Sequence, residues 1–350
     1  MKQNKSDLKH FKNWRPFIKY ILIVVALIVL ASLLFGIWRF FMPGPEKNES
    51  NSDLSGINKI SVERLEEDVQ FLSDTVGQRN IHAPGSLEKS ASWIEERMNK
   101  VGYKPDRHTY QISGLRYGGR SSDNIIAEST GSENPDEIVI VGAHYDTVYN
   151  SPGANDNGSA VAVLLSLAEW FSDKPLSRTI RFVAFVNEEP PFFHSSNMGS
   201  YAYAKKCRDL DENILAMMAF DGLGYFSDEP KSQSYPLPGL GFIYPKTANF
   251  IAFVTRLRDS GLLRTALKSF RDHASLPAEG AALPGFVPGV YWSDHWSFWK
   301  HDFPAFLVTD TLLFRDPAYH TPRDTPDRLD YNRMALLAGG LISVIERLAS

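Results

Sequence analysis

The stretch EIVIVGAHYD, residues 137–146, sets the pattern of the predicted fold, because an apolar run ends in two polar side chains, His144 and Asp146. Runs of this length and composition are typical of strands that are buried on both faces. SAVAVLLSLAEWF (159–171) follows with a helical pattern, and RTIRFVAFVNEE (178–189) is a second apolar run that ends in polar residues. We therefore expect strand–helix–strand units with polar groups at the strand ends.

The alternation continues toward the C-terminus. We expect a helix over GSYAYAKKCRD (199–209), strands over ILAMMAFDGLGY (214–225) and FPAFLVTDT (303–311), and a last helix over 331–349. This order predicts an α/β fold with a mixed, mainly parallel, twisted sheet and helices on both faces. The proline-rich segment 226–288 lies between two expected strands. We interpret it as an insertion near the active face of a single domain that covers 57–350.

The N-terminal region differs from this domain in composition. Residues 1–19 are basic, and residues 20–38 (YILIVVALIVLASLLFGIW) carry no charge. Nineteen helical residues at about 1.5 Å each cross a hydrocarbon core about 30 Å thick. The positive flank predicts a single-pass anchor in contact with the lipid bilayer, its N-terminus cytoplasmic and the following domain periplasmic or extracellular. A cleaved signal peptide is the alternative, but the apolar run is long for one and no A-x-A site follows.

Composition argues against a nucleic-acid partner and excludes an internal disulfide. A net charge of −4 and a pI near 6.2 give no basic surface of the kind that nucleic-acid partners require. The single cysteine, Cys207, excludes an intramolecular disulfide, so stability must come from the core or from bound metal. Residues 39–56, rich in Pro, Gly, Ser and Asn, predict a flexible stalk between the anchor and the domain. Composition leaves the oligomeric state open.

Candidate metal-binding residues lie at three expected strand ends, in one loop between them and in one Pro-rich loop downstream. In doubly wound sheets, ligands bind outside the carboxyl ends of the strands. Imidazole and carboxylate without thiolate suit zinc or another borderline divalent ion. Each residue alone also has an ordinary structural explanation, such as a helix cap or a turn. Those explanations do not account for repeated polar breaks at strand ends, and the candidates are His144, Asp146, Asp156, Glu188, Glu189, Asp221 and His320.

Six ordered motifs carry a family resemblance: GAHYD, GANDNGSA, NEEPP, AFDGLGY, SDHWSFWKHDFPAFLVTDT and YHTPRDTPDRLD. Together they resemble the M28 family of zinc peptidases, the aminopeptidase Y-like enzymes with co-catalytic metals, over residues 61–348. The resemblance implies the fold of zinc-dependent exopeptidases, which is similar to that of phosphorylases and hydrolases. It also implies two zinc ions per chain, with His144 and Asp221 on one ion, Glu189 and His320 on the other, and Asp156 bridging both.

The remaining motif residues receive roles from the same resemblance. Glu188 would be the general base, and Asp146 would orient the imidazole of His144. Two metals about 3.5 to 4 Å apart share a water or hydroxide and lower its pKa, and Glu188 would move its proton to the leaving amine. In the motif SDHWSFW, Asp294 and His295 would contact the substrate or support the site. Tyr225 is a candidate for the pocket wall, as are Tyr291, Trp292 and Trp296.

The predicted anchor and the resemblance together imply a membrane-anchored di-zinc exopeptidase acting on peptides, most consistent with an aminopeptidase. A carboxypeptidase of the same family remains open, because the sequence does not identify the group that would bind a free α-amine. A single-zinc transferase similar to glutaminyl cyclase and a non-catalytic ectodomain are further alternatives. The complete set of five ligands argues against the cyclase, and Glu188 argues against the non-catalytic protein. The native metal and the preferred side chain stay undetermined.

Overall fold

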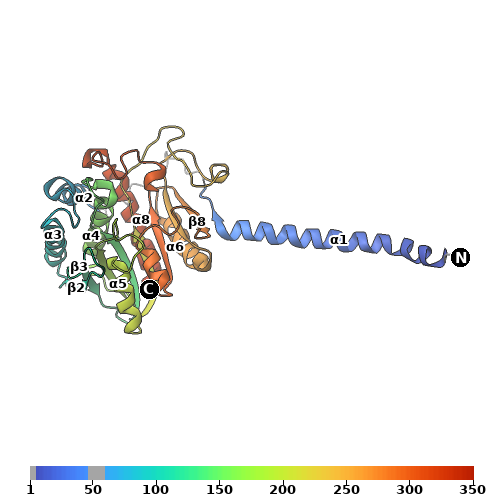
Figure 1. The fold of residues 1–350 in the computed structure, drawn as a ribbon, viewed down its shortest axis with the longest axis horizontal. Coiled ribbons are helices and arrows are strands. Elements are labelled where there is room, and N and C mark those ends of the chain that lie inside the picture. Colours follow the sequence, from blue (N-terminus) through green and yellow to red (C-terminus); the bar gives the residue numbers. More distant parts are fainter. Residues whose placement is uncertain (1–4, 46–59) are drawn as a thin grey trace. The chain divides into compact units, whose positions relative to one another are not determined.

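The computed structural model describes residues 5–45 and 60–350, which fall into two compact units, Met1–Met42 and Pro43–Ser350. The first unit contains helix α1 (Lys5–Phe40) and the short strand β1 (Phe41–Met42) (Figure 1). The predicted anchor over 20–38 lies within α1. Residues 46–56 of the predicted stalk and the first four residues of the basic tail lie outside the described residues.

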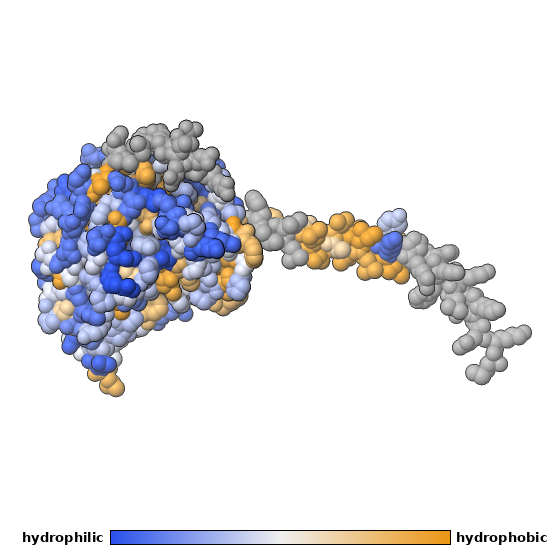
Figure 2. All heavy atoms as spheres, turned by 90° about the horizontal axis from the view of Figure 1, so that it is seen from above, coloured by the Kyte–Doolittle hydropathy of each residue, from blue (hydrophilic) through white to orange (hydrophobic). Residues whose placement is uncertain are grey.

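Helix α1 exposes apolar side chains from Tyr20 to Leu30, and Figure 2 shows one side of this apolar stretch. Within the part of the chain that the structure describes, no helix is both long enough and apolar enough to cross a membrane. The structure therefore does not support the predicted membrane span over 20–38.

The second unit is built on one mixed sheet, in which its strands follow the order β8-β7-β9-β6-β4-β5-β3-β2. Strand β4 runs parallel to β5 and β6, β6 parallel to β9, and β7 parallel to β8; the pairs β7–β9, β3–β5 and β2–β3 are antiparallel. The prediction of a mixed α/β sheet with a parallel centre is confirmed. The strands are β2 (Asp106–Gln111), β3 (Ser121–Ser129), β4 (Asn134–His144), β5 (Arg178–Phe185), β6 (Asn213–Phe220), β7 (Ile251–Arg256), β8 (Ala278–Leu283) and β9 (Ala305–Thr309).

The helices connect these strands in a way that creates a switch point. Helix α4 leads from β4 to its neighbour β5, and α5 then carries the chain back across β4 to β6. Because such crossovers are right-handed, opposite directions of travel place α4 and α5 on opposite faces. The carboxyl ends of β4, β5 and β6 meet where the direction reverses, which is where open α/β sheets bind ligands. The helices are α2 (Val62–Gln70), α3 (Ser86–Lys100), α4 (Ala160–Phe171), α5 (Gly199–Asp209), α6 (Ser260–His273), α7 (His295–Lys300) and α8 (Tyr331–Ala349).

The core lies on both faces of β4 and β6. Helix α4 is buried on all sides from Ala160 to Ala168, because α2, α3 and α8 cover the side that faces away from the sheet. Its sequence is correspondingly apolar around the whole circumference, and so it holds the loop at its N-terminus firmly against the strand ends.

Segment 226–288 differs from the expected irregular insertion. It contains β7, α6 and β8, which extend the sheet beyond β9. Its prolines mark only the connections: Pro277 directly precedes β8 and Pro284 directly follows it. Strand β8 reads AEGAAL, whose small residues have little strand propensity, and this explains why the periodicity did not reveal it.

Candidate active site

The carboxyl end of β4 carries His144 as its last residue, with Asp146 two positions on, and both are buried. His144 Nδ1 lies 3.2 Å from the backbone oxygen of Asp146 and 3.6 Å from its carboxylate. The Asp146 carboxylate accepts the backbone N–H groups of Glu188 and Glu189, each at 3.1 Å. Asp146 therefore fixes the loop after β5 to the end of β4, and the nearer acceptor for the imidazole is its carbonyl group.

Residues 154–159 form the turn that leads into α4 and carries Asp156. The turn begins at Gly153, whose φ of +62° lies in the left-handed region. A Cβ atom here would stand 2.3 Å from Thr147 Cγ2 and 2.4 Å from the backbone oxygen of Asp156, so the glycine allows the turn to pack against the end of β4.

Asn157 connects this turn to the end of β6. Its Nδ2 donates to the backbone oxygen of Phe220 at 3.0 Å, and its Oδ1 accepts the N–H of Gly222 at 3.0 Å. These two residues flank Asp221, so a single amide side chain sets the position of the Asp221 backbone relative to Asp156.

The five predicted metal-binding side chains come together in two groups. His144, Asp156 and Asp221 have one ligand atom each within 4.8 Å of one another, and so do Asp156, Glu189 and His320. His144 Nε2 lies 3.5 Å from Asp156 Oδ1 and 3.4 Å from Asp221 Oδ1. His320 Nε2 lies 3.0 Å from Asp156 Oδ2 and 3.2 Å from Glu189 Oε1. The two oxygens of Asp156 thus serve different groups, and the imidazole and carboxylate donors fit zinc.

Glu188 belongs to neither group of three, although its Oε2 lies 3.8 Å from His144 Nε2. Burial raises the pKa of the Glu188 carboxyl well above its usual value, and the charges of Glu189 and Asp221 add to this against the opposing effect of His144. Burial and the neighbouring Asp156 likewise raise the pKa of Glu189 to about 7. The site therefore favours bound cations or protons.

The imidazoles of His144 and His320 have raised pKa values and can hold such protons. Burial alone would lower the pKa of His144, but the surrounding carboxylates, Glu188 foremost, raise it well above its usual value. Burial is outweighed at His320 too, where hydrogen bonds with Asp156 and Glu189 raise the pKa to about 10. Metal binding would displace these protons, so this charge balance suits a divalent cation.

The sequence profile of Peptidase family M28 matches residues 124–344. The chain belongs to peptidase family M28. The resemblance seen in the six motifs is confirmed, and with it the prediction of a metallopeptidase. A relative in Escherichia coli (strain K12), the uncharacterized protein YfbL, is 34% identical over 331 residues, which cover 92% of this M28 chain and 98% of the relative.

Two solved structures share the fold of this M28 peptidase. BSAP, a zinc aminopeptidase from Bacillus subtilis, superposes with a TM-score of 0.63 over 82% of this chain and 94% of its own, at 17% identity. A glutaminyl cyclase from Fimbriiglobus ruber superposes with a TM-score of 0.59 over 82% of this chain and 95% of its own, at 18% identity. Since one fold carries both activities, the reaction must be argued from the site.

Asp324 is a supporting residue of the M28 site that the motifs alone did not single out. Its buried carboxylate accepts the backbone N–H groups of Asn155 at 2.7 Å and Asp156 at 3.1 Å. It stands four residues after His320 in YHTPRDTPDRLD, so one segment carries a predicted ligand and the carboxylate that binds the backbone of Asp156.

Arg79 supports the end of β4 and the turn that carries Asp156. Its fully buried guanidinium donates to the backbone oxygens of Tyr145 at 2.7 Å and Gly153 at 2.8 Å, and to three further carbonyl groups. Burial lowers its pKa to about 10 against the opposing effect of nearby carboxylates, Asp324 first and Asp146 second. It stands in the segment GQRN, which carries no recognisable signal.

Tyr319 was also missed, although it directly precedes His320. Its ring stacks on the His320 imidazole with the centroids 3.8 Å apart, and it lines the cavity described below. Burial raises the pKa of its hydroxyl, as do the site carboxylates, so the group stays protonated at neutral pH.

The three residues predicted as substrate contacts or supports lie outside the cavity wall. Asp294 is buried near His144, and burial raises its pKa to about 7. His295 Nε2 lies 2.8 Å from the backbone oxygen of Val290, and burial lowers its pKa to about 4. Tyr225 lies with its ring 5.2 Å from the guanidinium carbon of Arg328.

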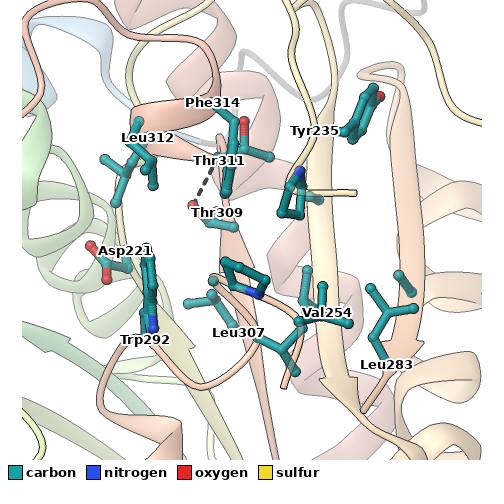
Figure 3. A pocket seen from close by; sticks show the side chains of 18 of the residues that line it. Asp221, Tyr235, Val254, Leu283, Trp292, Leu307, Thr309, Thr311, Leu312 and Phe314 are labelled. Carbon is teal, nitrogen blue, oxygen red and sulfur yellow. Dashed lines mark hydrogen bonds between the residues drawn. The ribbon is translucent and has the colours of Figure 1, made fainter. Parts of the chain in front are cut away.

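A cavity of about 300 Å³ opens beside the metal-binding groups. Asp221 and Trp292 lie at one end, and Tyr235 and Leu283 lie toward the other (Figure 3). Of the aromatic residues predicted for the pocket wall, Trp292 lines this cavity, and Tyr225, Tyr291 and Trp296 do not. Strands β7, β8 and β9 form the floor, and the segments around residues 233–244, 287–292 and 311–314 form the cover. The wall is predominantly apolar, as is usual for sites that bind small molecules.

Proposed function

We propose that this M28 chain is a di-zinc aminopeptidase that releases N-terminal residues from peptides. The observation that carries the proposal is the pair of three-residue groups that share Asp156, beside a buried Glu188 that belongs to neither. A single-zinc cyclase has no need for the second group. A non-catalytic protein would gain nothing from Glu188, because burying a carboxyl group that binds no metal costs free energy.

In this proposal, His144 and Asp221 bind one zinc ion, Glu189 and His320 bind the other, and Asp156 binds both. Bound zinc in such a pair lowers the pKa of a water molecule and polarises a carbonyl group.

Glu188 takes the proton from the attacking water and delivers it to the leaving amine. Tyr319, protonated and in the cavity wall, is placed to donate a hydrogen bond to the substrate.

The charge of the cavity favours the amino end of the substrate over the carboxyl end. Four carboxylate side chains, Asp156, Glu188, Glu189 and Asp221, line its metal-binding end. None of the described residues that line the cavity is a lysine or an arginine. A carboxypeptidase would need such a cation for the terminal carboxylate, so the lack of one among the described lining residues favours an aminopeptidase.

The test is zinc content and hydrolysis by the purified full-length protein, compared with the variants Glu188→Gln and Glu189→Gln. We expect about two zinc ions per chain and release of the first residue from free peptides but not from N-acetylated ones. Glu188→Gln should keep both ions and lose about 10²- to 10⁴-fold in kcat, whereas Glu189→Gln should also lose zinc. One zinc with cyclisation of N-terminal glutamine, or release from the C-terminus alone, would contradict the proposal.

We also propose that the apolar surface of α1 contacts a lipid bilayer, with the peptidase domain on the periplasmic or extracellular side. Tyr20, Leu22 and Ile28 are 69%, 63% and 60% exposed, and apolar side chains left in water around a helix favour a lipid surface. The full chain should float with anionic vesicles, and the double variant Leu22→Lys and Ile28→Lys should not. Recovery of the unaltered chain in the soluble fraction would contradict this proposal.

Protease added outside whole cells should reach the peptidase domain. Full protection of the domain from that protease would contradict the predicted periplasmic or extracellular side.

A further inference from the structure

Glu279 is a carboxylate in the cavity wall that the proposed reaction does not use. It lies on β8, is 5% exposed, and its Oε2 accepts the backbone N–H of Gly44 at 2.6 Å. The neighbouring Arg271 directs Nε and Nη2 to the backbone oxygen of Ala278, at 3.0 and 2.7 Å. Burial raises the pKa of Glu279 to about 7, and the Gly44 hydrogen bond and Arg271 oppose this.

The register of the sheet shows how Glu279 is placed relative to the metal-binding groups. Ala252 on β7 pairs with Glu279 on one side and with Thr309 on β9 on the other. Asp221 follows Phe220, which pairs with Val308, so Asp221 stands beside Thr309 in the same row. Strands are about 4.8 Å apart, so Asp221 and Glu279 are separated by about 14 Å across the sheet.

The row between the two carboxylates forms an open trough. Its floor carries only the short side chains of Thr309 and Ala252, and all four residues of the row line the cavity. The next row of the floor is Leu307, Val254 and Ala281, which keeps the trough apolar (Figure 3). The trough is thus apolar between the predicted metal-binding carboxylates at one end and Glu279 at the other.

This charge pattern has a chemical complement. Lysine and arginine combine an apolar stem with a cationic tip, and they bury the stem while the charge meets a partner. An uncharged aliphatic side chain would fill the same trough but leave the buried Glu279 carboxylate without a new partner at its end. The span of about 14 Å holds one extended long side chain together with the carboxylate groups that reach toward it.

We propose that Glu279 is a specificity residue that binds the ammonium or guanidinium group of an N-terminal lysine or arginine in the substrate. This inference rests on the proposed aminopeptidase function, with the α-amine and the scissile carbonyl at the metal-binding end. The substrate class would then be peptides with a basic first residue.

The experiment compares aminoacyl-anilides of lysine, arginine and norleucine, because norleucine has the aliphatic stem without the charge. For the full-length protein we expect kcat/KM for lysine and arginine to exceed that for norleucine at least about 10-fold. In Glu279→Gln, which keeps the size of the side chain, we expect kcat/KM for the two basic substrates to fall at least about 10-fold and norleucine to be unchanged or faster. Glu212→Gln, a glutamate paired with Arg181 and outside the cavity lining, is the matched control and should change neither.

The outcomes separate this inference from the proposed function. If no substrate loses its first residue although zinc is bound, the aminopeptidase proposal fails. If norleucine is released faster than lysine and arginine, the aminopeptidase stands and the role of Glu279 is overturned. An equal loss on all three substrates in Glu279→Gln, with unchanged zinc content, would also overturn it. Glu279→Asp, with a shorter reach, should recover part of the preference for the basic substrates.

Discussion

The two halves of the sheet contribute to the site in different ways. In the charged half, β4, β5 and β6, the strand ends supply charged side chains. In the apolar half, β7, β8 and β9, one face of the strands supplies a mainly apolar floor. In the first half the carboxylates of Asp324 and Asp146 accept backbone N–H groups, and that of Asp221 lies 3.4 Å from the His144 imidazole. In the second half shape and small side chains matter more than hydrogen bonds. Chemistry and selectivity are therefore separable, and substitutions in one half should leave the other intact.

Asp156→Asn should have the largest effect, because it breaks the charged half at the residue that both groups share. An amide has one acceptor oxygen and no charge, so it cannot replace both carboxylate oxygens. We expect fewer than two zinc ions per chain by elemental analysis and a loss of at least about 10³-fold in kcat/KM. Asp330→Asn, at the N-cap of α8, is the control that should keep both values. Full zinc content with normal activity would refute the shared role of Asp156.

Val254→Phe tests the apolar half, since Val254 lies in the cavity floor. A larger ring should fill the trough, so kcat/KM for lysyl and norleucyl substrates should fall about 10- to 100-fold. An alanyl substrate should change little, and zinc content should not change at all. Val254→Ala should act in the opposite direction. Equal losses on small and large side chains would show that the two halves are not separable.

Asp324→Asn tests a residue that supports the charged half without belonging to the two predicted metal-binding groups. The variant weakens the hydrogen bonds to the N–H groups of Asn155 and Asp156, so the turn that carries Asp156 should loosen. We expect zinc affinity, measured by competition with a chelator, to fall about 10-fold. Asp327→Asn, exposed and three residues later, should have the affinity of the unaltered protein. An unchanged affinity in Asp324→Asn would mean that the turn does not depend on this clamp.

The smallest expected effect is a pH dependence of stability from Glu279. Its pKa of about 7 in the folded chain lies above its usual value of 4.5, so the folded state binds more protons between these values. The stabilisation is full below pH 4.5 and is lost as pH rises toward 7. Between pH 5 and 6 the free energy of unfolding of the unaltered protein should fall by about 1 kcal/mol more than that of Glu279→Gln, by urea titration. Parallel pH profiles would contradict the raised pKa.

The charged half could be predicted from sequence because each ligand follows an apolar run or lies in a recognisable motif. His144, Glu189 and Asp221 each end a hydrophobic stretch, and that local break is visible without a structure. Asp324 and Arg79 could not be found this way, because their partners are backbone groups far away in the chain. A side chain that bonds to a distant peptide group leaves no pattern in the sequence around it.

The apolar half was predicted poorly for a different reason. The alternation on β8 places Glu279, Ala281 and Leu283 on one face, but alanine and glycine give too little contrast in hydropathy to show it. The segment that carries β7 and β8 was therefore expected to be an irregular insertion. Its place in the sheet depends on pairing with β9 and is not encoded locally.

The buried Arg79 has a consequence for how the protein acquires its metal. A permanent positive charge beneath the carboxylates, held by five carbonyl contacts, offsets their mutual repulsion before any zinc arrives. Many small zinc domains fold only together with their metal. We expect this chain to fold first and to bind zinc afterwards, so that the chelated protein still unfolds in one cooperative transition and regains zinc without refolding.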